Sequence, residues 1–150
     1  MKDFRKITNK QLGEILVDRG MVTREQLEEA LKIQKVQDGL LIGEILVNAK
    51  YTSEENIVQA LTAQYGFPYL PLSNYEIAPD VLTVVPIHIC KKYCLVPIDK
   101  IGKSLTLAMA NPLNLSALED VELVTNCTVQ TFVSTATDIK TAIKRYYESA

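Results

Sequence analysis

The stretch QLGEILVDRGMVTREQLEEALKIQ, residues 11–34, recurs in altered form as LIGEILVNAKYTSEENIVQALTAQ, residues 41–64. The two stretches are identical at nine of 24 positions, and five of these nine form the contiguous block GEILV. Shared helical composition explains scattered matches, whereas a contiguous block with matching ends indicates duplication. The N-terminal part of the chain is therefore predicted to contain two copies of one structural unit.

Each copy predicts a pair of short helices. Apolar residues recur at the three-to-four spacing that places them on one helix face. Thr8 with Gln11 and Thr23 with Gln26 have the spacing of a capping box at a helix start. The second copy repeats this pattern over residues 40–64. We therefore expect four short helices arranged as two αα-hairpins.

Downstream of three closely spaced prolines the pattern changes to short β-branched runs separated by helical segments. Two short helices are expected at 79–84 and 86–93, followed by strands at 94–98 and 105–110 that turn at Gly102. A helix at 116–124, opened by a capping box of Ser116 with Glu119, comes next. A strand at 128–134 and a helix from 138 complete the predicted elements. The strand, helix and strand over residues 105–134 predict a parallel crossover.

The predicted fold class is α+β. A bundle of four short helices occupies residues 1–66, a linker occupies residues 67–78, and a small α/β domain with a mixed sheet of three to four strands occupies residues 79–150.

Charge and composition exclude several classes of protein. The formal net charge of −2 divides evenly between the two parts, which argues against a nucleic-acid partner. Residues 1–9 lack a signal peptide pattern, and no apolar run approaches the length of a transmembrane segment. Three cysteines without a secretory signal predict reduced thiols and a cytoplasmic location.

No arrangement of residues predicts catalysis or metal binding. The sequence contains neither a phosphate-binding P-loop pattern nor the dinucleotide-binding glycine pattern. His88, Cys90, Cys94 and Cys127 lack the paired spacing of a structural zinc site. They also lack an evident orienting residue for a nucleophilic cysteine. We therefore expect a chain that is not an enzyme and that holds no metal or cofactor.

Gly13 and Gly43 stand inside predicted helices, where glycine costs about 1 kcal/mol relative to alanine. Two explanations fit this cost. Either the missing side chain lets a neighbouring helix pack closely, or a flat ligand lies against the bare backbone. Physical reasoning alone favours close packing.

Residues 11–34 resemble the 24-residue motif of the MshEN domain, R-L-G-x-x-L-x-x-x-G followed after six residues by L-x-x-x-L-x-x-Q. The first copy differs only at Gln11, where the motif has arginine. The second copy departs at Leu41, in place of the arginine, and at Lys50, in place of the second glycine. The stretches VVPIHICKKYCLVPI, LTLAMANPLNLSALEDV and DIKTAIKRYY are similar to the N-terminal region of GspE/PilB-type ATPases of type II secretion and type IV pilus assembly.

The resemblance implies a regulatory domain whose tandem motifs bind cyclic di-GMP, one motif for each guanylate half. It also implies partnership with an ATPase core, in cis or in trans, and with an inner-membrane platform protein. The chain would then be peripheral to the membrane. The implied ligand-binding residues are Gln11, Leu12, Gly13, Leu16, Gly20, Leu27, Leu31, Gln34, Leu41, Ile42, Gly43, Leu46, Ile57, Leu61 and Gln64.

The sequence is compatible with two functions. In the first, the chain is a cyclic di-GMP sensor. In the second, it is a protein-protein adaptor that has kept the fold and lost the ligand. The loss of both motif arginines favours the adaptor function. Gln11 can form hydrogen bonds but carries no charge, and the Leu41 side chain can neither form hydrogen bonds nor carry charge.

Overall fold

The computed structural model describes residues 12–37 and 41–148. The contacts divide the chain into two compact units, and the division falls between Ala60 and Leu61. This point lies inside helix α4, Glu54–Tyr65, upstream of the predicted linker at residues 67–78. Each unit is described on its own below.

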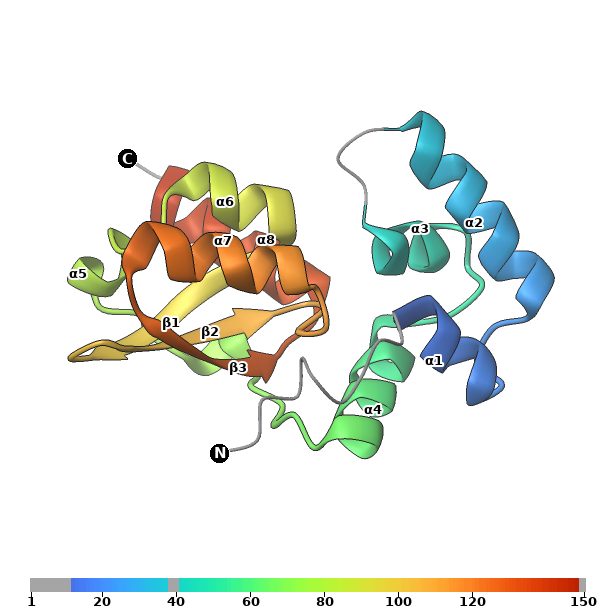
Figure 1. Ribbon diagram of the computed structural model, residues 1–150, viewed down its shortest axis with the longest axis horizontal. Coiled ribbons are helices and arrows are strands. Elements are labelled where there is room, and N and C mark those ends of the chain that lie inside the picture. Colours follow the sequence, from blue (N-terminus) through green and yellow to red (C-terminus); the bar gives the residue numbers. More distant parts are fainter. Residues whose placement is uncertain (1–11, 38–40, 149–150) are drawn as a thin grey trace. The chain divides into compact units, whose positions relative to one another are not determined.

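The first unit is helical. Its elements are α1, Leu12–Asp18, α2, Arg24–Val36, α3, Ile42–Asn48, and the first part of α4. Helix α3 packs against both α1 and α2 (Figure 1). The predicted four short helices are confirmed. The buried apolar side chains of this unit are Leu12, Ile15, Leu16, Val22, Leu27, Ala30, Ile45, Leu46, Ile57 and Ala60.

The cap of α2 confirms the second predicted capping box. The Gln26 N–H donates to Thr23 Oγ1 at 3.1 Å, and the Thr23 N–H donates to Gln26 Oε1 at 2.9 Å. In the second copy the Asn56 N–H donates to Ser53 Oγ at 3.1 Å. The shorter Asn56 side chain donates to Thr52 Oγ1 instead of accepting from the cap. The box predicted from Thr8 lies outside the described residues.

The second unit contains a three-stranded sheet and its covering helices. Its elements are η2, Leu72–Asn74, α5, Pro79–Leu82, α6, Ile87–Tyr93, β1, Leu95–Ile101, β2, Ser104–Met109, α7, Leu115–Thr125, β3, Thr128–Val133, α8, Ala136–Ile143, and a π-helical turn η3, Lys144–Glu148. The strand order is β1-β2-β3, with the first pair antiparallel and the second parallel. The α+β class and the mixed sheet are confirmed.

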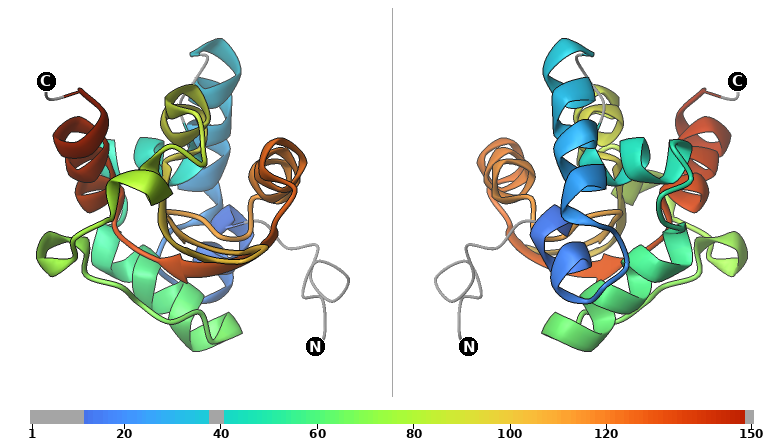
Figure 2. Two further views of the ribbon diagram at one scale, coloured as in Figure 1. Left: turned by 90° about the vertical axis from the view of Figure 1, so that its left-hand side faces the viewer. Right: turned by 90° about the vertical axis from the view of Figure 1, so that its right-hand side faces the viewer.

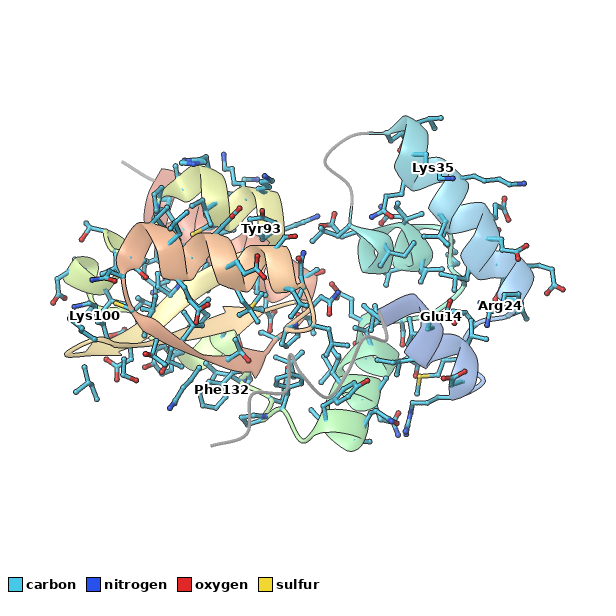
Figure 3. The ribbon with its side chains drawn as sticks, viewed as in Figure 1. Glu14, Arg24, Lys35, Tyr93, Lys100 and Phe132 are labelled. Carbon is cyan, nitrogen blue, oxygen red and sulfur yellow. The ribbon has the colours of Figure 1, made fainter. Side chains whose placement is uncertain are left out.

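The register of the strands separates an apolar face of the sheet from a more polar one. On β2, Leu105, Leu107 and Met109 point to the same side and are buried. Helices α6, α7 and α8 cover one face of this sheet, with α6 between the other two (Figures 1 and 2). Phe132 on β3 lies on the opposite face (Figure 3). The apolar core of the unit therefore lies between the sheet and these three helices.

The starts of α6, α7 and α8 differ from the prediction, and α8 begins at Ala136, two residues before the predicted position 138. Helix α7 is capped by Asn114, whose Oδ1 accepts from the Ala117 N–H at 3.2 Å, and not by Ser116. A preceding turn, in which Asn111 Oδ1 accepts from the Leu113 N–H, leads the chain into the helix two residues earlier. Pro86 is the N-cap of α6 and not its first helical residue, because its ψ of 144° is extended.

The predicted linker runs beside the sheet. Tyr69 forms a parallel bridge with Val133, and the Leu70 N–H donates to the Val133 carbonyl at 3.0 Å. The buried Ser134 hydroxyl donates to the Leu70 carbonyl at 2.9 Å. These bonds tie residues 68–70 to the C-terminal end of β3.

Candidate ligand site in the tandem repeats

The backbone repeats itself after thirty residues at the end of α1 and of α3. The Met21 N–H donates to the Leu16 carbonyl at 2.9 Å, and the Tyr51 N–H donates to the Leu46 carbonyl at 3.0 Å. Gly20 has a φ of 72°, and Lys50, at the equivalent position, has a φ of 65°. The second copy therefore keeps the left-handed helix ending of the motif without its glycine.

Lys50 adopts the left-handed backbone conformation, which has a higher free energy for a residue with a Cβ than for glycine. We expect Lys50→Gly to stabilise the first unit by about 0.5 kcal/mol, because the relieved strain exceeds the extra flexibility of glycine in the unfolded chain. The guanidinium chloride midpoint, followed by far-UV circular dichroism, measures this change. Gly20→Ala is the opposite control and should lower the midpoint. A lower midpoint for Lys50→Gly would contradict the strain argument.

Gly13 is a point of close helix contact. A Cβ placed on Gly13 would lie 2.5 Å from Leu27 Cδ1, and Leu27 is 2% exposed. A Cβ on Gly43 would lie 3.3 Å from Ile57 Cδ1 and 3.4 Å from Leu12 Cδ2. The surroundings of both glycines support the packing explanation, and the contact is tighter in the first copy.

The difference between the two glycines predicts different outcomes for the same substitution. Gly13→Ala should destabilise the first unit by about 1–2 kcal/mol, since overpacking a buried leucine outweighs the helix propensity gained. Gly43→Ala should stay within about 0.5 kcal/mol of the wild type. Hydrogen exchange of the α2 amides measures both variants. Equal losses in the two would refute the assignment of Gly13 as the tighter contact.

The predicted site residues form two groups by solvent exposure: buried residues, which act as a scaffold, and residues that reach the surface. The motif positions that are buried are Leu12, Gly13, Leu16, Leu27, Leu46, Ile57 and Leu61. The positions that reach the surface are Gly20, Leu31 and Gln64, with Gln34, Leu41, Ile42 and Gly43 partly exposed. Buried leucines hold the helices together and have little surface to offer a ligand. Direct contact with a ligand is therefore limited to the second group.

Not all of these positions belong to the described part of the first unit. Gln11 lies outside the described residues. Leu61 and Gln64 fall in the second unit, so the second motif spans the division within α4. Leu41 is the N-cap of α3 and makes no side-chain cap hydrogen bond. In the second copy, an apolar side chain at the N-cap of α3 thus occupies the position where the motif has arginine.

Two polar contacts of the first unit were missed by sequence reasoning. Arg24 Nη1 and Glu14 Oε1 are 3.0 Å apart (Figure 3), and this hydrogen-bonded pair raises the pKa of Arg24. The Tyr51 hydroxyl donates to Glu29 Oε2 at 2.5 Å, which raises the pKa of Tyr51. The partners in each pair are ten or more residues apart, so no short-range pattern in the sequence indicates them.

The surroundings of the three cysteines indicate a structural role. Cys90, Cys94 and Cys127 are all buried. Burial raises the pKa of Cys90 to about 11, and its thiol lies 3.6 Å from the Tyr147 hydroxyl. A protonated, buried thiol is a poor nucleophile. Across residues 12–37 and 41–148, no cluster of three histidine, cysteine, aspartate or glutamate side chains is placed to hold a metal ion.

Comparison with known proteins gives similarity over nearly the whole chain. It is 34% identical to the type IV pilus assembly ATPase PilB of Myxococcus xanthus over 137 residues, which is 91% of this chain and 24% of that protein. It is 32% identical to PilB of Thermus thermophilus over 143 residues, 94% of this chain and 16% of that protein. The chain thus spans about a quarter or less of the length of these relatives.

Solved structures agree with the fold. A structure of MshE with cdg (cyclic di-GMP) superposes with a TM-score of 0.67 and 27% identity, covering 93% of this chain and all of that one. The N-terminal domain of XpsE superposes with a TM-score of 0.70 and 19% identity, over 98% and 99% of the two chains. The latter likeness establishes the fold alone.

The family model described as the MshEN domain matches residues 65–150. The match begins after both repeats, so it rests on the unit that contains the sheet. Fold and sequence together define the class of N-terminal domains found in the PilB, MshE and XpsE ATPases. This chain belongs to the MshEN domain family. None of the helices in the described part of the chain combines the length and the apolar character needed to cross a membrane.

Proposed function

We propose that this chain is a non-catalytic regulatory and interaction domain of a type II secretion or type IV pilus assembly ATPase, and that residues 11–34 and 41–64 bind cyclic di-GMP. The observation that carries the proposal is the repeated backbone: the helix endings after Leu16 and Leu46 make the same hydrogen bonds thirty residues apart. A ligand with two similar halves suits a duplicated element. The similarity to MshE, whose structure contains cyclic di-GMP, supports the choice of ligand.

The surface positions of the motifs define how the ligand is held. Gln34 and Gln64 each offer an amide that can donate and accept hydrogen bonds to a guanine edge. Leu31 and Ile42 offer apolar surface on which a base can lie. The buried leucines keep the helices in place and affect binding through the fold.

The alternative is an adaptor without nucleotide binding. One observation favours it: Leu41 is apolar at the position where the motif has arginine. A bidentate arginine contact to guanine in nucleic-acid recognition is worth about 1–3 kcal/mol. Losing two such contacts, even at the low end, weakens affinity roughly thirtyfold.

The proposed partners follow from the same relatives. An ATPase core, in cis or in trans, supplies the nucleotide hydrolysis, and an inner-membrane platform protein of a secretion or pilus system is the docking partner. The proposed location is cytoplasmic, peripheral at the inner membrane through these partners. We expect no ATP hydrolysis by the purified chain, because the sequence contains no phosphate-binding loop.

Isothermal titration with cyclic di-GMP tests the proposal. We expect saturable heat with ligand added to about 100 µM, and a rise in melting temperature because the ligand binds only the folded chain. Gln34→Ala and Gln64→Ala should each weaken the binding, while the exposed Lys100→Ala in the second unit should leave it unchanged. The absence of both heat and thermal shift would eliminate the sensor function and leave the adaptor.

A further inference from the structure

The cations of the second unit are concentrated on two neighbouring helices. Residues 61–150 contain seven lysines and arginines, and five of them belong to α6, α8 and η3. These five are Lys91, Lys92, Lys140, Lys144 and Arg145, and all five side chains are exposed. We call these five residues the α6–α8 basic face.

Helical spacing places these cations on the outer surface. Lys91 and Lys92 follow the exposed His88 by three and four residues, which puts the three on one side of α6. Lys140 and Lys144 are four residues apart and project from the same side of α8. The opposite sides of both helices are buried against the core.

The two helices are held next to each other. Tyr147 on η3 donates a hydrogen bond to the Leu82 carbonyl at 2.8 Å, and its oxygen lies 3.6 Å from Cys90 Sγ on α6. Figure 2 shows α6 and α8 as neighbours above the sheet, with α7 on the far side of α6. The exposed cations of α6, α8 and η3 therefore lie on neighbouring helices.

The acidic residues of the helices that cover the sheet are mostly on α7. Asp138 is the one acidic side chain of α6, α8 and η3 that the structure describes, and it is half-buried in the first turn of α8. Glu119, Asp120 and Glu122 are on α7, which carries no cation. Asp120 accepts a hydrogen bond from the Tyr93 hydroxyl of α6. Three of the five acidic residues of α6, α7, α8 and η3 thus belong to α7.

We propose that the α6–α8 basic face binds the surface of an anionic phospholipid membrane. Protein interfaces are enriched in aromatic residues and arginine and depleted in lysine, whereas this face is mostly lysine. Among the large apolar side chains exposed in the described residues, none belongs to α6, α8 or η3. A surface of exposed lysines without apolar anchors matches the diffuse negative charge of lipid headgroups, and the contact is electrostatic and reversible. This proposal does not depend on cyclic di-GMP binding.

The expected strength follows from the number of lysines. Each lysine near an anionic membrane contributes roughly a fivefold increase in the partition coefficient. Removing two of them therefore lowers partitioning roughly thirtyfold. Reversing their charge lowers it further. Salt weakens the attraction because it screens charges on an exposed surface.

The test is co-sedimentation of the full 150-residue chain with vesicles of phosphatidylcholine, with and without about 30% phosphatidylglycerol. We expect binding to the anionic vesicles alone, and loss of binding as NaCl rises from about 0.05 M to about 0.3 M. Lys140→Glu/Lys144→Glu should reduce partitioning at least thirtyfold. Lys100→Glu/Lys103→Glu makes the same charge change at the β1–β2 turn and should alter it only a few-fold.

Far-UV circular dichroism confirms that each variant is folded, and Lys91→Gln/Lys92→Gln on α6 serves if the α8 variant does not fold. Three outcomes would overturn the proposal. The first is equal sedimentation with neutral and anionic vesicles. The second is equal loss in the α8 and turn variants, which would assign the effect to net charge. The third is binding to an acidic polypeptide such as polyglutamate without binding to vesicles, which would point to a protein partner.

Discussion

Leu46→Ala is expected to lower the stability of the first unit by about 2–5 kcal/mol. Leu46 is 0% exposed, and its helix α3 packs against α1 and α2. Truncation removes buried apolar atoms and leaves a cavity that a small helical unit closes only in part. Leu16 is the repeat-equivalent residue, is also 0% exposed, and should show a loss of the same size.

Denaturant unfolding and hydrogen exchange of the α2 and α3 amides measure these losses. Leu31→Ala is the matched control, since Leu31 is a motif leucine that is 38% exposed and should cost less than about 1 kcal/mol. If Leu16→Ala and Leu46→Ala differed by several kcal/mol, the two copies would not be equivalent parts of one core. That result would contradict the interpretation of the two copies as equivalent structural units.

Leu41→Arg is expected to strengthen cyclic di-GMP binding roughly tenfold or more. Leu41 is partly exposed at the N-cap of α3, and its side chain caps nothing, so an arginine there displaces no existing hydrogen bond. The new guanidinium restores the charged donor of the motif. Isothermal titration of the variant and the wild type gives the two dissociation constants.

Leu41→Gln is the control for charge, because it supplies the hydrogen-bonding group found at Gln11 without the cation. It should gain less than Leu41→Arg. If the wild type binds and Leu41→Arg binds no better, the missing arginine is not what limits affinity. If neither protein binds, the adaptor function stands and the repeats serve the fold alone.

Local signals in the sequence accounted for much of the fold. The four helices of the repeats followed from apolar spacing, and the capping box of Thr23 followed from residues three positions apart. The hairpin at Gly102, where φ is 60°, and the parallel return through α7 followed from strand patterns and a turn residue. Each of these features depends on residues close in sequence, so periodicity and turn chemistry were sufficient. The N-cap of α7, Asn114, was missed because Asn114 and Ser116, two residues apart, are competing cap candidates.

The sequence by itself determined the duplication, the α+β class and the positions of the motif residues. Only the tertiary structure decided which of those residues are scaffold and which are surface, because burial depends on neighbours far along the chain. It placed Leu27 over Gly13, bonded Tyr51 to Glu29, and showed that Lys50 adopts the left-handed ending that Gly20 adopts in the first copy. It also placed α6 and α8, which both carry exposed cations and are separated in sequence by the whole sheet, next to each other. Periodicity shows which side of a helix is apolar, but only packing determines which helices lie next to each other.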